Sequence, residues 1–393
     1  MSRIGIYGGA FNPPHIGHIR AAEYAIRELN LSKLLLIPSC SSPHKPLPAG
    51  SATPQERLAM VKLWAGEKME VCDIELNRGG TSYTYQTVEQ LKAQYPQDEL
   101  ILFMGTDMFL SFQTWKEPER ILSCVSLAVF YRGDKGEKSA IADRKKEYEA
   151  QGHTVYLVEN PVTEISSTQL RRMLVFRCAA PFLDEKVLGY IEENGLYGTG
   201  RNYRNLSMEE LESVVVELLN PNRVRHVLGC RDTAAELARI WGADETDAAR
   251  AGLLHDITKA LDGPLQLTLC HEYGKVMDEF SENNPKTLHA LTGSLVAQRI
   301  FGENEAVVAA IESHTTGKPA MNTLQKIIYV ADYMEPNRDF PGVEEIRHLA
   351  YTDLDGALKL GLEMTLAVLK AQSRQISPAS SQALQYLIRQ RGE

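Results

Sequence analysis

The chain has 393 residues, 44% of them hydrophobic, which is enough for two domains with separate cores. It shows no run of about 18 apolar residues and no leader pattern after Met1, so we expect neither a membrane span nor a signal peptide. Of the net charge of −9, residues 201–393 carry −7 (20 Lys+Arg against 27 Asp+Glu), which argues against a nucleic-acid surface and permits a cation site. The six cysteines are scattered without a CxxC pair, as is typical of reduced thiols in a cytoplasmic protein.

The first 18 residues combine the elements of a phosphate-binding turn. The apolar run 4–7 predicts a buried strand, and Gly8 and Gly9 lead from it towards a helix. Glycines let the backbone approach a ligand, and a helix start offers unpaired N–H groups. His15 and His18 are three residues apart and share one face of the first helical turn. We interpret the stretch as a polyphosphate clamp rather than as a tight turn with two surface histidines.

Strand and helix patterns alternate up to about residue 200 and predict an α/β doubly wound parallel sheet. Further strands are expected at 33–37, 69–76, 100–104, 126–131 and 155–158. Helices are expected at 16–29, 54–65, 85–95 and 134–150.

Three side chains follow predicted strands, where α/β proteins carry their sites. Lys45, in the Pro/Ser-rich loop 38–54, could reach a phosphate or be an exposed lysine. Asp107, just past a strand and a glycine, could bind a ribose hydroxyl or cap a helix. Trp115 could stack on a flat ring or anchor the packing.

A second phosphate site is indicated by the string that begins at Ile165. Ser166, Ser167 and Thr168 bring three hydroxyls to a predicted helix start, and Arg171 lies one turn further on. A helix cap explains one hydroxyl, whereas a bound phosphate explains the hydroxyls, the N–H groups and the guanidinium together.

Together these motifs resemble bacterial nicotinate-mononucleotide adenylyltransferase, a Rossmann-like nucleotidyltransferase with a His-x-Gly-His signature. The resemblance covers the first ~200 residues, and the matching stretches are GGAFNPPHIGH (8–18), PHK (43–45), RGGTSYTYQT (78–87), FMGTDMFLSFQTW (103–115), ISSTQLR (165–171) and VLGYIEENGLY (187–197). It implies that ATP and nicotinate mononucleotide are joined, with Mg²⁺, into deamido-NAD and pyrophosphate. Such chemistry needs positioning and charge neutralisation and no covalent intermediate.

By this resemblance, ATP and its phosphates are bound by Gly8, Gly9, Phe11, His15, His18, Asp107, Ile165, Ser166, Ser167, Thr168 and Arg171. Nicotinate mononucleotide is bound by Lys45, Thr84, Trp115 and Arg132, with the tryptophan stacked on the pyridine. Catalytic roles fall to His15, His18, Lys45 and Arg171. The chain departs from the family at Ala10, where a threonine is usual, and at Gln113-Thr114. A phosphopantetheine adenylyltransferase is the alternative, and TSYT and the Trp after GTD favour the pyridine nucleotide.

The second half is predicted to be all-α. A polar linker at 201–206 joins domain 1–200 to domain 207–393, and Ser207 with Glu210 forms a capping box that opens a helix. Helical periodicity runs through 208–219, 223–239, 244–259, 264–272, 287–301, 303–313, 321–334 and 354–373.

Polar residues interrupt apolar stretches on five of these helices, at His226, His255, Asp256, His289, His314 and Asp332. A single buried histidine is usually a satisfied core residue, but four histidines and two aspartates facing inward indicate a metal centre. Nitrogen and carboxylate ligands suit Fe, Mn or Mg better than a Cys-rich zinc site. His289 and His314 leave room for a second metal, and two metals suit the hydrolysis of a phosphoanhydride.

The adjacent pair His255-Asp256, with His226 before it and Asp332 after it, resembles the HD superfamily. The stretches AGLLHDITK, LHALTGSLVA, SHTTGK and VADYMEPNR are similar to bacterial hydrolases that split diadenosine tetraphosphate symmetrically into two ADP, over about 205–375. The resemblance implies one iron on His226, His255, Asp256 and Asp332 and a second served by His289 and His314. Asp256 would take part in catalysis, and Lys259 could hold a substrate phosphate.

We therefore predict a bifunctional cytoplasmic enzyme with an HD domain behind a nucleotidyltransferase. Its partners are the small nucleotides ATP, nicotinate mononucleotide and diadenosine tetraphosphate, with no nucleic acid and no membrane; a homo-oligomer is left open. The alternative is that the HD half is a nucleotide- and metal-binding regulatory module, or a dimerisation module, without turnover.

Overall fold

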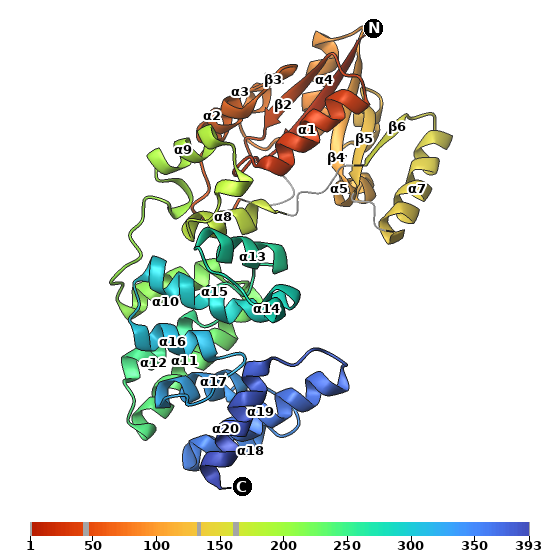
Figure 1. Ribbon diagram of the computed structural model, residues 1–393. Helices are drawn as coiled ribbons and strands as arrows, with labels where there is room; N and C mark the ends of the chain where they lie inside the picture. The colour runs from red at the N-terminus through yellow and green to blue at the C-terminus, as the bar shows by residue number, and fades with distance from the viewer. Residues whose placement is uncertain (1, 42–46, 132–134, 160–164, 393) are drawn as a thin grey trace. The chain divides into compact units, whose positions relative to one another are not determined.

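The computed structural model describes residues 2–41, 47–131, 135–159 and 165–392. The chain divides into two compact units, Met1–Arg201 and Asn202–Glu393, which Figure 1 colours from red to yellow-green and from green to blue. The division between Arg201 and Asn202 falls within the predicted linker, 201–206. Within that linker, Tyr203 packs in the second unit against Phe301, with the ring centroids 6.0 Å apart.

The first unit is built on a six-stranded sheet in which all neighbouring strands are parallel. The strands are β1 Arg3–Gly9, β2 Lys33–Pro38, β3 Met69–Val71, β4 Glu99–Gly105, β5 Ser126–Tyr131 and β6 Val155–Glu159. Their order, β3-β2-β1-β4-β5-β6, reverses direction between β1 and β4. The predicted α/β doubly wound sheet is therefore confirmed, and a crevice is expected at the carboxyl ends of β1 and β4.

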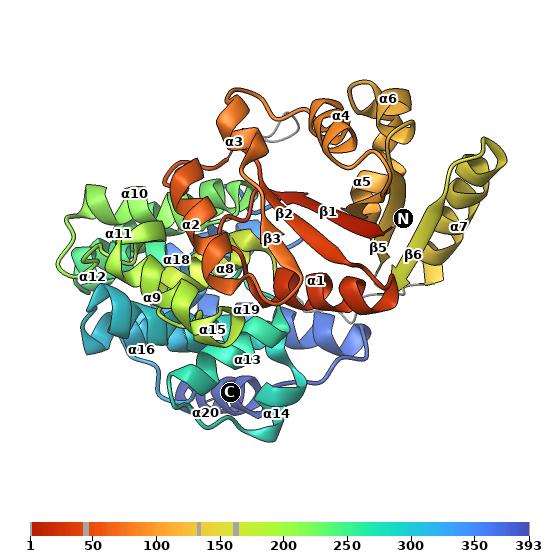
Figure 2. The ribbon, with the colours of Figure 1, turned by 90° about the horizontal axis from the view of Figure 1, so that it is seen from above.

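Helices cover both faces of this sheet. Right-handed crossovers put the helix between β1 and β2 on one face and the helices that follow β3 on the other, and Figure 2 shows α1 and α4 on opposite sides. The helices are α1 Ile16–Glu28, α2 Pro54–Trp64, α3 Ile74–Arg78, α4 Thr84–Gln94, α5 Thr106–Leu110, α6 Pro118–Leu122, α7 Lys135–Ala150, α8 Ser167–Val175 and α9 Glu185–Glu193. Because both faces are covered, Leu34, Leu35, Leu36 and Ile37 of β2 are each at most 1% exposed.

The strand predicted at 69–76 is wrong in its second half. β3 pairs with β2 over three residues only, from Met69 to Val71. Beyond them the backbone makes helical hydrogen bonds instead, such as that from Asn77 N to Asp73 O at 2.9 Å, and Ile74 begins α3. At the edge of the sheet β3 pairs with β2 alone, and the chain leaves it after Val71 although β2 continues to Pro38.

All regular secondary structure in the described residues of the second unit is helical, and the all-α prediction is confirmed. Its α-helices are α10 Met208–Leu218, α11 Pro221–Trp241, α12 Glu245–Leu254, α13 Gly263–Glu272, α14 Glu279–Asn283, α15 Leu288–Val296, α16 Glu305–Ser313, α17 Thr323–Met334, α18 Val343–Thr352, α19 Leu354–Ala371 and α20 Pro378–Arg391. Helices α11 and α12 pack closely at Gly252, where a Cβ would lie 2.8 Å from the Cα of Arg231. This contact brings the end of α12 against the middle of α11.

Two helix predictions for this unit differ from the structure. The helix expected over 244–259 ends at Leu254, and residues 255–259 form turns closed by hydrogen bonds such as Lys259 N to Asp256 O at 2.9 Å. His255 and Asp256 therefore project from a helix end rather than from one helical face. No helix was predicted for α18 or α20, although Val343, Ile346 and Ala350 of α18 are buried at helical spacing.

Candidate functional site

A cavity of about 620 Å³ opens at the carboxyl end of the sheet, at the point where the strand order reverses. Many of the predicted nucleotide-binding residues line it: Gly8, Gly9, His15, His18, Thr84, Asp107, Trp115 and Ile165. Asp107 lies in the first turn of α5, and Gly105 occupies the N-cap position, so the alternative that Asp107 caps this helix is wrong. Trp115 also packs on Phe112, with the ring centroids 5.2 Å apart.

His15 and His18 form the wall of this cavity at the start of α1. Their rings lie 3.7 Å apart between centroids. Burial lowers the pKa of His15 to about 4, and burial together with the charge of His15 holds the pKa of His18 well below its usual range. Both imidazoles are therefore neutral at physiological pH.

The backbone selects the tautomer of His18. Its Nδ1 accepts a hydrogen bond from the His15 backbone N–H at 3.1 Å, so the proton of the neutral ring resides on Nε2. The Nδ1 of His15 is buried and has no hydrogen-bond partner within the described part of the chain. The pair thus offers a ring N–H donor and an unsatisfied polar atom beside a helix start, an arrangement suited to a phosphate ligand.

The loop before α1 is held by two arginines. Arg57 of α2, fully buried, donates from Nη1 to Ala10 O at 2.6 Å and from Nη2 to Ser39 O at 2.6 Å. Arg171 donates to Asn12 O at 2.8 Å. Sequence analysis missed Arg57, whose acceptors are backbone carbonyls with no sequence signature.

Apart from Ile165, the second phosphate string lies beside this loop but outside the cavity lining. Ser166 is the N-cap of α8, and its hydroxyl accepts from Gln169 N at 3.2 Å. Arg171 also donates to Thr168 Oγ1 at 3.2 Å. Those predicted residues that do not line the cavity are Phe11, Ser166, Ser167, Thr168 and Arg171. Phe11 instead packs under the loop on Tyr7 and His18, while Lys45 and Arg132 lie outside the described residues.

Among the lining residues that the sequence analysis did not name is Glu75. Glu75 of α3 is 8% exposed and accepts a hydrogen bond from Thr87 Oγ1 at 2.8 Å. Arg78 donates to the same hydroxyl at 2.9 Å. Thr87 follows Thr84 by about one helical turn on α4. The contacts of Glu75 and Arg78 with Thr87 therefore hold in place the helix that carries Thr84, a residue predicted to bind nicotinate mononucleotide.

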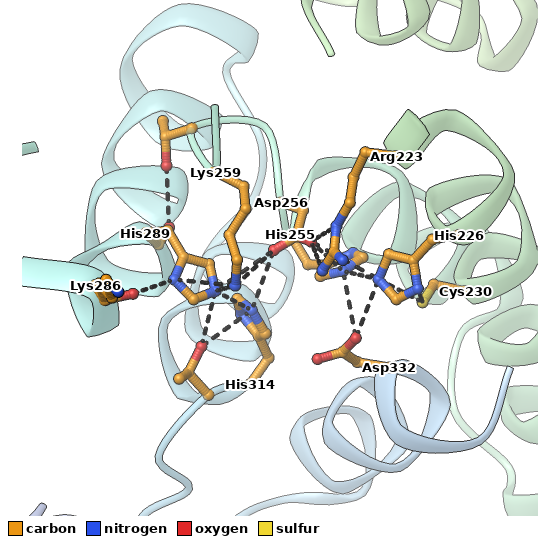
Figure 3. Close-up of polar contacts among 12 residues, drawn as sticks. Arg223, His226, Cys230, His255, Asp256, Lys259, Lys286, His289, His314 and Asp332 are labelled. Atoms are coloured by element: carbon orange, nitrogen blue, oxygen red, sulfur yellow. Dashed lines mark hydrogen bonds and ion pairs between the residues drawn. The ribbon is translucent and has the colours of Figure 1, made fainter. Parts of the chain in front are cut away.

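The second unit brings together all six predicted metal ligands (Figure 3). In a first group, His226 Nε2 lies 3.2 Å from His255 Nε2 and 3.1 Å from Asp332 Oδ1. Asp256 Oδ2 lies 3.5 Å from His255 Nε2 and 3.7 Å from His226 Nε2. These ligands come from α11, from the turn after α12 and from α17.

A second group lies on the other side of Asp256. His289 Nε2 and His314 Nε2 are 3.2 Å apart, and Asp256 Oδ1 lies 3.4 Å from the former and 3.8 Å from the latter. The two oxygens of one carboxylate therefore face two groups of histidines. Asp256 Oδ1 is buried and has no hydrogen-bond partner among the described residues.

Each of the four histidines directs Nε2 towards a group because its Nδ1 is bound elsewhere. Three of the Nδ1 atoms face backbone carbonyls: His255 faces Gly252 at 2.7 Å, His289 faces Lys286 at 2.9 Å, and His314 faces Ile311 at 2.7 Å. The Nδ1 atom of His226 faces the carboxylate oxygen Oε1 of Glu335 at 3.1 Å. An Nδ1–H bound to oxygen leaves a lone pair on Nε2. Lone pairs 3.2 Å apart repel each other, and a cation between them removes the repulsion, so the donor set fits metal ions.

Burial keeps the imidazoles of His255, His289 and His314 unprotonated. It lowers the pKa of His255, lowers that of His289 to about 3 and lowers that of His314 to about 4. Burial alone would raise the pKa of Asp332, but nearby positive charge, including the Arg338 guanidinium, holds it well below the usual range. Neutral imidazoles and ionised carboxylates are the protonation states that metal binding requires.

Three cations surround the carboxylates of the two groups. Arg223 Nε donates to Asp256 Oδ2 at 2.6 Å, and Arg338 Nη2 donates to Asp332 Oδ1 at 2.6 Å. Lys259 Nζ lies 2.8 Å from His289 Nε2 and 3.7 Å from Asp256 Oδ1. Lys259, Arg338 and Arg223 thus place positive charge beside both groups, and Arg223 was missed by the sequence analysis.

Two more residues of this site were missed, and both had a spacing signal. Cys230 follows His226 by one helical turn, and its Sγ lies 3.7 Å from His226 Nε2. Glu335, 1% exposed, follows Asp332 by three residues and accepts the Nδ1 proton of His226. Gly229 makes room for that carboxylate, since a Cβ there would lie 2.3 Å from Glu335 Oε2.

Comparison with known proteins finds relatives for both halves of the chain. Residues 6–173 match the cytidylyltransferase-like family and residues 223–337 match the HD domain. The Geotalea daltonii protein named "Probable nicotinate-nucleotide adenylyltransferase" is 36% identical over 216 residues, covering 51% of this chain and 100% of that relative. The Bacillus subtilis "Bis(5'-nucleosyl)-tetraphosphatase, symmetrical" is 36% identical over 185 residues, covering 47% of this chain and 98% of that relative.

A solved structure matches the second half. It is the Clostridium acetobutylicum protein described as a predicted HD superfamily hydrolase involved in NAD metabolism, with 36% identity, a TM-score of 0.46, and coverage of 47% of this chain and 98% of that one.

The sheet, its cavity and the histidine–aspartate groups define a nucleotidyltransferase-type domain followed by an HD domain. The chain belongs to the nicotinate-nucleotide adenylyltransferase family over its first half and to the symmetrical bis(5'-nucleosyl)-tetraphosphatase family over its second. Both resemblances drawn from the sequence are thereby confirmed. Within the described residues, no helix is both long enough and apolar enough to cross a membrane.

Proposed function

We propose that the first unit transfers AMP from ATP to nicotinate mononucleotide, giving deamido-NAD and pyrophosphate. In this reaction a phosphate oxygen of the mononucleotide forms a bond to the α-phosphorus of ATP while the bond from that phosphorus to the bridging oxygen breaks. The observation that carries the proposal is one cavity lined by His15 and His18 at a helix start, by Asp107 past β4, and by Thr84 and Trp115. Mg²⁺ bound with ATP would neutralise part of the triphosphate charge.

In this proposal the chain's own groups position the reactants. The neutral His18 donates from Nε2 to the phosphates, His15 lies beside it, and the hydroxyls of Ser166–Thr168 and the guanidinium of Arg171 hold the outer phosphates. Asp107 accepts from ribose hydroxyls. Trp115 stacks on the pyridine ring, and Lys45 and Arg132 add positive charge near the phosphates.

The test is a substrate panel for the intact chain, with ATP and either nicotinate mononucleotide or phosphopantetheine. We expect deamido-NAD and pyrophosphate from the first pair. His18→Ala should lower kcat by about 10²–10³, the usual cost of one donor to charge that develops in a transition state. Unchanged turnover in that variant would remove His18 from the mechanism, and a strong preference for phosphopantetheine would refute the substrate.

We further propose that the second unit hydrolyses diadenosine tetraphosphate symmetrically to two ADP. The supporting observation is that Asp256 faces both groups of histidines, so that His226, His255, Asp256 and Asp332 would hold one metal and Asp256, His289 and His314 a second. The metals, which we take to be iron with Mn or Mg as alternatives, would activate water and absorb charge on the leaving phosphate. Arg223, Lys259 and Arg338 supply the positive charge that binds the phosphate chain.

Product analysis with the intact, metal-loaded chain tests this second activity. ADP as the only nucleotide product is expected, and Asp256→Ala should lose both bound metal and turnover because the residue faces both positions. AMP plus ATP would mean attack at a different phosphorus. Metal binding without hydrolysis would favour the regulatory-module alternative, and a wild-type chain that retains no metal would refute the metal centre.

The two proposed activities occupy separate stretches of chain. We assign the transferase to 1–200 and the hydrolase to 207–393, joined by 201–206. The six cysteines have free thiols, which supports placing the protein in a reducing compartment such as the cytoplasm.

A further inference from the structure

Beside the first histidine–aspartate group lies a cysteine, a residue type that the HD pattern does not use. Cys230 lies on α11 one turn after His226, and its side chain is 1% exposed (Figure 3). Its Sγ lies 3.7 Å from His226 Nε2 and 3.8 Å from the carbonyl oxygen of Ala331. A thiol makes only weak hydrogen bonds, so neither contact fixes it strongly.

The ligand atoms of His226, Cys230, His255 and Asp332 all lie within 4.8 Å of one another. Bonds of about 2.0–2.1 Å to nitrogen or oxygen and ~2.3 Å to sulfur give a tetrahedral site edges of roughly 3.3 Å between nitrogen or oxygen atoms and roughly 3.5 Å to sulfur. The observed separations from His226 Nε2 are 3.2 Å to His255 Nε2, 3.1 Å to Asp332 Oδ1 and 3.7 Å to the thiol. The three edges that meet at His226 Nε2 are therefore close to those of a tetrahedral metal site, and the edge from His255 Nε2 to Asp332 Oδ1 is longer, at 3.8 Å.

Asp256 competes with Cys230 for this position but is engaged elsewhere. Its Oδ2 accepts from Arg223 Nε at 2.6 Å, and its Oδ1 faces His289 at 3.4 Å. To bind a cation at the first group, Asp256 must loosen a charged hydrogen bond, whereas Cys230 must release its weak contact with Ala331 and lose its thiol proton.

We propose that His226, Cys230, His255 and Asp332 form a tetrahedral site for a soft divalent cation such as Zn²⁺. The site shares three ligands with the first HD metal position and uses the thiol in place of Asp256. On binding, the S–H bond breaks, the proton passes to solvent and a sulfur–metal bond forms, with no change of oxidation state. A cation held in this way is bound by three of the four ligands expected for the first HD metal, His226, His255 and Asp332. It is not coordinated by Asp256. The site itself does not depend on the second unit being a hydrolase.

The experiment is titration of the metal-free, full-length chain with Co²⁺, followed by displacement with Zn²⁺. A thiolate–Co²⁺ charge-transfer band in the near ultraviolet, with the visible bands of tetrahedral Co²⁺, is the expected result. Cys230→Ser should lose the charge-transfer band, while Cys270→Ser, at a buried cysteine of α13 outside the cluster, should keep it. Loss of an orienting group around a metal ligand already costs about 10–100-fold in affinity, so loss of the thiol should weaken Zn²⁺ binding at least about 100-fold.

A second pair of variants separates the two ligand sets. Asp256→Asn should keep the charge-transfer band, because the thiol site does not use Asp256, and His226→Gln should abolish it. A band that persists in Cys230→Ser, or Co²⁺ binding by the wild type without any such band, would overturn the proposal. Cys230→Ala, with thermal unfolding of every variant, separates loss of the ligand from loss of the fold. None of these readouts uses nucleotide hydrolysis, so failure of the hydrolase proposal would leave the result intact.

Discussion

Replacement of Arg57 by alanine should destabilise the first unit and disturb its cavity. The guanidinium is fully buried and donates to the carbonyls of Ala10, Ser39 and Cys40 at 2.6, 2.6 and 3.2 Å. Hydrogen bonds to a charged group contribute about 1.5–3 kcal/mol each, but burying the charge costs several kcal/mol, so the net loss is about 3 kcal/mol. For a unit of roughly 200 residues this corresponds to a fall of about 6–12 °C in Tm.

Differential scanning calorimetry of the intact chain measures this change. The unfolding transition of the first unit is identified as the one that added ATP shifts to higher temperature. Arg57→Lys keeps the charge but cannot bridge all three carbonyls, so it should fall between alanine and the wild type. Lys62→Ala, at an exposed position of the same helix, is the matched control and should change stability by less than about 0.5 kcal/mol.

The same variants should lose transferase activity in the same order, because Ala10 and Ser39 both line the cavity. An Arg57→Ala chain that melts within about 2 °C of the wild type and turns over normally would refute the reasoning. It would mean that water replaces the guanidinium at these carbonyls without cost.

Three further predictions concern single side chains. Burial lowers the pKa of His15 to about 4 against about 6.5 in the unfolded chain, so its contribution to stability is complete above about pH 6.5 and is lost as the pH falls. At pH 5 the loss is about 2 kcal/mol, and His15→Gln should reduce the fall in Tm between pH 7 and 5; an identical fall would contradict this. Glu335→Gln should weaken metal retention about 10–100-fold by releasing the ring of His226, and unchanged metal content after dialysis against chelator would count against that role. Trp115→Ala should raise KM for nicotinate mononucleotide several-fold, from about 0.5–1.5 kcal/mol of stacking, with KM for ATP unchanged. Equal effects on both substrates would indicate that Trp115 only packs on Phe112.

The sequence predicted the sheet well because its signal is local. The run Leu34–Ile37 reads as a buried strand, and in the structure it is one. The histidines and aspartates of the candidate metal site were predictable as a cluster for a related reason: a histidine or aspartate inside an apolar stretch is costly unless something binds it. His226 and Asp332 are 106 residues apart in sequence, yet each is conspicuous in its own helix.

Residues that act through the backbone left no such signal. Arg57 looks like an ordinary helical arginine, and its acceptors lie 47, 18 and 17 residues away along the chain. Glu335 carries a weak signal, since it follows Asp332 by three residues, but its partner His226 lies 109 residues earlier. Only the fold brings these partners together, so spacing alone could not reveal which group each residue binds.

The two units contain buried, neutral histidines that suit opposite kinds of ligand, and the hydrogen bond at Nδ1 decides which kind. In the second unit, Nδ1 of His255 faces the carbonyl of Gly252 at 2.7 Å, so the proton resides there and Nε2 presents a lone pair to a cation. In the first unit, Nδ1 of His18 accepts from the His15 backbone at 3.1 Å, so Nε2 carries the proton and can donate to an anion. Burial lowers the pKa of both His18 and His255 and prevents double protonation in either place. The same side chain thus suits phosphate binding in one unit and metal binding in the other, because the local backbone offers an N–H in the first case and a carbonyl in the second.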